Sequence, residues 1–149
     1  MGFVNRAVKA TYDTRAAIAT GEARAIIQKH SETLAQYLLF AEETPLPAGG
    51  AEGAAALKEF FLARARKTTK GASLREFDLR TRMFKYRCSY MIHSAAFTGL
   101  PAPLKTAVLK NIRTALLTEH ALSAHLPVAE KQAIHSILSA TFAPYTAVK

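Results

Sequence analysis

The chain has 149 residues, about the length of one domain, and half of its residues are apolar, which is enough for a core without disulfides or metals. The single cysteine, Cys88, excludes an internal disulfide and fits a reducing compartment. Scarce Gly and Pro, abundant Ala, and few Val and Ile favour helix over sheet. We therefore expect one all-α domain over residues 1–149.

The net charge of +9 is unevenly distributed along the chain. Residues 58–87, named here the basic segment, hold ten Lys or Arg against three acids, and the rest of the chain is nearly balanced. Such an excess raises the local potential and attracts acidic partners, although a merely solvated surface has the same composition.

The N-terminal residues 1–6 have no apolar run after their first basic residue, so no signal peptide is expected. A long stretch without Lys, Arg, Asp or Glu, residues 88–104, contains a histidine and two prolines, which makes it a poor transmembrane candidate. These features predict a cytoplasmic protein without a transmembrane segment.

The first predicted helix covers residues 3–43, with a break near Thr20-Gly21. The sequence TPLP at 44–47 ends it, and two glycines mark the following loop. A second helix is predicted over residues 52–67, with Leu57, Phe60 and Phe61 facing inward.

The third predicted helix, residues 74–97, begins with the capping box Ser73 to Glu76. It has two apolar stripes on nearly opposite faces, and basic residues fill the seams. One stripe is Leu74, Phe77, Thr81, Phe84, Cys88, Met91 and Ala95, and the other is Leu79, Met83, Tyr86 and Tyr90. A helix that is apolar on two faces is buried on both, which predicts a central helix or one that also docks on a partner.

Two more helices follow, one starting at Pro103 and one led by Pro127 at its first position. The expected fold is therefore a compact bundle of five or six helices around a central helix at about 74–97. The mixture of Tyr and Arg on the second stripe and its seams is typical of interface cores. The predicted partner-binding residues are Arg80, Arg82, Lys85, Tyr86, Arg87 and Tyr90.

No catalytic, cofactor or metal site is expected. The five histidines form no i,i+4 pair, and neither HExxH nor Cys-x-x-Cys occurs. On a helix, Cys88 and His93 would be about 140° out of phase and could not act as nucleophile and base. The glycines form no phosphate-binding loop.

Residues 73–94, SLREFDLRTRMFKYRCSYMIHS, resemble a segment near the C-terminus of large, functionally uncharacterised bacterial proteins. The phrases FAEETPLP at 40–47 and FTGLP at 97–101 are similar too, so the resemblance spans most of residues 30–117. It implies a helical module, once attached to something larger, and it implies no activity and no functional residues.

These patterns predict a non-enzymatic interaction or accessory subunit that binds a larger acidic protein through a basic, Tyr-containing surface. The alternative is a nucleic-acid-binding helical protein that uses residues 58–87, although no recognised nucleic-acid motif accompanies the charge. A helical enzyme or cofactor binder would need a pocket that the sequence does not reveal.

Overall fold

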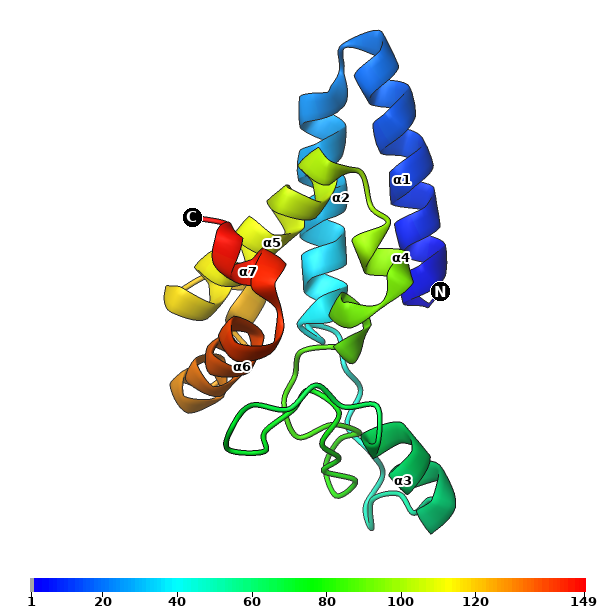
Figure 1. The fold of residues 1–149 in the computed structure, drawn as a ribbon, viewed down its shortest axis with the longest axis vertical. Helices are drawn as coiled ribbons and strands as arrows, with labels where there is room; N and C mark the ends of the chain where they lie inside the picture. The colour runs from blue at the N-terminus through cyan, green and yellow to red at the C-terminus, as the bar shows by residue number, and fades with distance from the viewer. Residues whose placement is uncertain (1) are drawn as a thin grey trace.

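The computed structural model describes residues 2–149 and is all-α, as predicted (Figure 1). The described residues form seven α-helices and two short 3-10 turns. The α-helices are α1 (Phe3–Thr20), α2 (Ala23–Leu38), α3 (Ala55–Leu62), α4 (Ala95–Thr98), α5 (Ala102–Leu117), α6 (Val128–Thr141) and α7 (Ala143–Ala147). The 3-10 turns are η1 (Tyr90–His93) and η2 (Ala121–Ser123).

Helices α1 and α2 form an antiparallel hairpin, which confirms the predicted break at Thr20-Gly21. Gly21 ends α1 with a φ of 80°, a left-handed conformation in which glycine has no Cβ to clash. The small residues Ala7 and Ala10 are buried on α1, which packs against both α2 and α4. His30 of α2 lies 2.8 Å from the carboxylate of Asp13 on α1, which links the helices at their surface.

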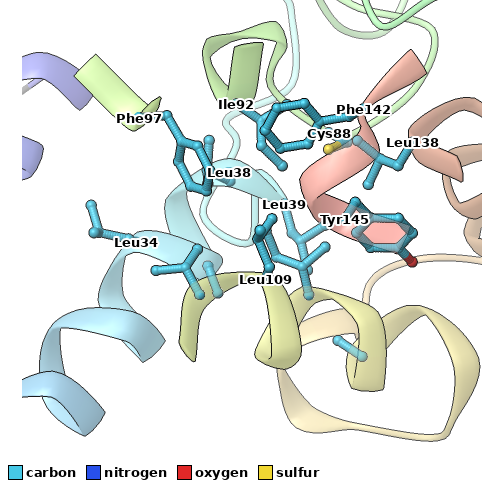
Figure 2. Close-up of a cluster of buried hydrophobic side chains, with 14 of the residues drawn as sticks. Leu34, Leu38, Leu39, Cys88, Ile92, Phe97, Leu109, Leu138, Phe142 and Tyr145 are labelled. Carbon is cyan, nitrogen blue, oxygen red and sulfur yellow. The ribbon is translucent and has the colours of Figure 1, made fainter. Parts of the chain in front are cut away.

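The core lies between α2, α5 and the C-terminal helices (Figure 2). Leu34 and Leu38 of α2 pack with Leu109 of α5, and all three are buried. From the C-terminal end, Phe142 and Tyr145 close the same cluster. The buried residues of α5 and α6 recur at helical spacing along 104–116 and 134–138, so each helix buries one apolar face.

Residues 40–89 form a lobe that extends away from the bundle (Figure 1). Helix α3 is the only helix in this lobe. The predicted central helix at 74–97 is wrong, because residues 74–89 form turns and only η1 and α4 follow them. The bundle is instead centred on α2, which packs against α1 on one side and α5 on the other. The predicted 52–67 helix is reduced to α3.

A tight turn replaces the helix. Phe77 and Phe84 pair as an isolated antiparallel bridge, and the Asp78 carboxylate accepts hydrogen bonds from the Arg80 N–H and the Thr81 hydroxyl. Such local bonds offer the backbone an alternative to the helical ladder. Leu79 has a φ of 61°, which is incompatible with a right-handed helix.

The loop before α3 fixes this turn from outside. The Leu46 N–H donates to the Thr81 carbonyl and the Ala51 N–H donates to the Leu79 carbonyl. At Gly50 a Cβ would lie 2.2 Å from the Leu79 oxygen, so only glycine lets the two backbones approach this closely. Contacts between distant segments therefore outweigh the helical preference of residues 74–89.

No helix among residues 2–149 is both long and apolar enough to cross a membrane.

Candidate interaction surface

An aromatic cluster joins the lobe to the bundle. Phe61 of α3 contacts the rings of Phe77, Phe84 and Tyr90, with centroids 5.2, 5.9 and 4.9 Å away. The Arg75 guanidinium covers Phe61 and Tyr90 at 4.4 and 4.5 Å from their centroids and donates to the Phe61 carbonyl. Tyr90, predicted to contact a partner, thus packs within the chain, where it helps to hold α3.

Arg87, a second predicted partner residue, forms an ion pair within the chain. Its Nε donates to both carboxylate oxygens of Glu130 at 3.1 and 3.2 Å, and Nη2 donates at 2.6 Å. The Arg87 backbone N–H donates to the same carboxylate at 2.9 Å. Burial raises the pKa of Glu130, but the Arg87 hydrogen bonds outweigh it, and the pKa is lowered. This pair ties the end of the lobe to the first turn of α6.

Arg82 and Lys85 also have acidic neighbours within the chain. Arg82 Nε lies 3.8 Å from Asp78, and Lys85 Nζ lies 3.4 Å from Glu76. The Tyr86 hydroxyl, followed by Glu76, raises the pKa of Lys85 above its ordinary value. The Lys85 pair lies close to solvent, where such pairs contribute little stability and remain available to a competing carboxylate. Arg82 Nε is instead buried and makes no hydrogen bond to the part of the chain that the structure describes.

The last two predicted residues differ in exposure. Tyr86 is half-buried against the core, and Arg80 is exposed at the tip of the turn. The six residues therefore do not share one helical face, since the helix that would have aligned them is absent. Their role in binding a partner remains a prediction.

Other cations of the basic segment have no acidic partner. Within residues 2–149, no carboxylate forms an ion pair with Lys58, Arg66, Lys67 or Lys70, nor with Arg80. Arg66, Lys67 and Lys70 are exposed in the connection that follows α3. These unpaired charges keep their full attraction for an acidic partner.

The sequence pattern wrongly placed Leu57 and Phe60 inside the protein. They are 66% and 60% exposed, and only Phe61 of the three faces the aromatic cluster. Helical spacing indicated an apolar face but not whether anything packs on it. Met83, at the tip of the turn, is also exposed.

Cys88 and His93, whose side chains can act in catalysis, lie in surroundings that do not favour catalysis. Cys88 is fully buried, and burial raises the pKa of its thiol to about 12, so it is not a nucleophile at neutral pH. Burial, aided by Arg66 and Arg75, lowers the pKa of His93 to about 4. Its ring packs edge-on against Phe142, with centroids 5.2 Å apart. Across residues 2–149, no three His, Cys, Asp or Glu side chains are grouped to hold a metal ion.

A surface hollow of about 510 Å³ lies where α2 ends, and its lining includes Tyr37, Phe40, Glu42 and Glu43 together with Arg6 of α1. Burial raises the pKa of Glu43 despite the nearby arginines. The hollow combines aromatic and acidic groups, but its lining includes neither a histidine nor a cysteine.

Comparison with protein-family models, with curated proteins and with solved structures yields no match to this chain.

Proposed function

We propose that this chain is a non-enzymatic interaction or accessory subunit that binds a larger acidic protein through its lobe. The observation that carries the proposal is the set of unpaired cations after α3, of which Arg66, Lys67 and Lys70 are exposed. In the same lobe, Leu57 and Phe60 of α3 add exposed apolar surface, which supports a protein partner more than a nucleic acid.

The test starts with affinity capture from the native host, using tagged wild type beside Lys67→Glu/Lys70→Glu. The matched control is Lys29→Glu/Lys110→Glu, which changes two exposed lysines of the bundle and gives the same net charge. Any captured protein is then purified, and its Kd is measured with all three chains. Capture of a protein by the tagged chain does not by itself show that the lobe binds it.

The proposal expects one acidic protein whose Kd rises at least about tenfold with the lobe variant and changes little with the control. A protein bound equally by both variants would contradict it. Recovery of nucleic acid, with affinity that falls steeply with salt for any duplex, would support the alternative instead. The resemblance of residues 73–94 to the end of larger bacterial proteins remains a separate prediction.

A further inference from the structure

Resting on the proposed function, we infer that α3 is the apolar anchor of the contact. In this arrangement the partner offers an apolar groove rimmed by carboxylates, and Leu57 and Phe60 insert into it. Helices that bind in this way use a few apolar side chains at helical spacing.

Helix α3 has an apolar face that remains largely exposed and is covered only in part, by the Arg64 side chain over Phe60. None of its residues is fully buried, and Leu57 and Phe60 are exposed by 66% and 60%. They are three positions apart and so lie on the same side of the helix. The same helix is attached to the lobe by Phe61 and needs neither side chain for that attachment.

Helix α3 is also already held in place. Besides the ring contacts of Phe61, Arg75 Nη1 donates to the Phe61 carbonyl at 3.1 Å. An anchor fixed before binding loses less conformational entropy than a flexible segment, so more of its contact energy contributes to affinity.

The charge of Arg64 beside Phe60 indicates that the groove on the partner has carboxylates at its rim. The Arg64 guanidinium lies 3.6 Å from the centroid of the Phe60 ring and has no carboxylate partner among residues 2–149. Inserting Phe60 would bring Arg64 to the rim of the groove, where a carboxylate could pair with it. Aromatic side chains next to arginine are typical of the residues that dominate binding energy.

An anionic membrane is the main competitor for this face. However, α3 has only eight residues and two exposed large apolar side chains. Even a single myristoyl chain gives only marginal membrane binding, and two side chains bury less apolar surface than that. The observations therefore favour a protein groove.

The experiment uses the whole chain with p-benzoylphenylalanine in place of Phe60, and in a control in place of Val128, which is 70% exposed on α6. Each chain is irradiated with the purified captured protein, and the cross-linked peptide is sequenced. In parallel, Kd is measured at low and high salt for Leu57→Ser/Phe60→Ser and for Val128→Ser. Melting temperatures verify that each variant is folded.

We expect cross-linking at position 60 alone, to a peptide with apolar residues flanked by acids. We also expect Kd to rise about tenfold for Leu57→Ser/Phe60→Ser at both salt concentrations, because apolar contacts are insensitive to salt. If this variant binds like wild type while Lys67→Glu/Lys70→Glu binds weakly, α3 is not the anchor and the proposed function survives. If neither variant is impaired, both proposals are wrong. Binding of wild type, but not the Ser variant, to phosphatidylglycerol vesicles would make the occupant a membrane and overturn the inference.

Discussion

Replacing Arg87 with Ala should destabilise the whole fold. The side chains of Arg87 and Glu130 are only 17% and 10% exposed, and the substitution removes three hydrogen bonds to the carboxylate. The Glu130 charge would then stay largely buried, with only the Arg87 backbone N–H as a donor. Breaking a buried pair by removing one partner costs roughly 3–5 kcal/mol, and partial exposure places this pair near the lower value.

For a domain of this size, a loss of about 3 kcal/mol lowers the melting temperature by roughly 6–12 °C. This loss of stability is measured by thermal and urea unfolding of wild type and Arg87→Ala at neutral pH. Lys85→Ala is the control, because its pair with Glu76 is long at 3.4 Å and Lys85 is 54% exposed. That variant should stay within about 1 kcal/mol of wild type.

A third variant separates the contribution of the Glu130 charge to stability from the contribution of its hydrogen bonds. Glu130→Gln keeps an oxygen for the Arg87 backbone N–H but loses the charge, so its stability should lie between wild type and Arg87→Ala. A loss of stability in Arg87→Ala no larger than that in Lys85→Ala would show that the Arg87–Glu130 pair does not stabilise the fold. In that case Arg87 would be free to serve a partner, as the sequence pattern suggested.

Three further predictions concern single positions. In urea unfolding, Gly50→Ala should destabilise the chain more than Gly49→Ala. Both glycines have positive φ, but only at position 50 would a Cβ meet the Leu79 oxygen. Equal losses of stability in the two variants would contradict this close contact. Because the pKa of His93 is about 4 when folded and near 6.5 when unfolded, the unfolded state binds more protons between these pH values. Stability should therefore fall as pH drops from about 6.5 to 4, by on the order of 2 kcal/mol, and His93→Phe should flatten this slope; an unchanged slope would exclude His93 as its source. Native Cys88 should resist Ellman's reagent at pH 8 and react once the protein is unfolded, whereas rapid reaction of the native thiol would show that it is accessible.

The bundle could be predicted from sequence because its signals are local. The break at Thr20-Gly21 separates α1 from α2, and Pro103 and Pro127 mark the starts of the later helices, as the structure confirms. Apolar spacing then identifies the buried faces without knowledge of the neighbouring helix.

The lobe could not be predicted because distant segments determine it. The capping box at Ser73 forms in part, since the Ser73 N–H donates to Glu76, but the chain then turns at Leu79 instead of continuing as helix. The backbone bonds from Leu46 and Ala51 that fix this turn come from a loop about thirty residues earlier.

The contacts that the predicted site residues make within the chain could not be predicted from sequence for the same reason. The acid that pairs with Arg87 lies 43 residues away, so the charge pattern alone could not identify it. Three exposed cations without an acidic partner, Arg66, Lys67 and Lys70, follow α3. Leu57 and Phe60 on α3 are exposed, although their helical spacing is typical of a buried face.

The most direct test of the proposed function is amide hydrogen exchange of the chain alone and in complex with the protein that it captures. If the lobe binds the partner, exchange over residues 55–70 should be slower in the complex, with α1 and α6 unchanged. Protection confined to α1 or α6, with residues 55–70 unaffected, would contradict the claim that the lobe binds the partner.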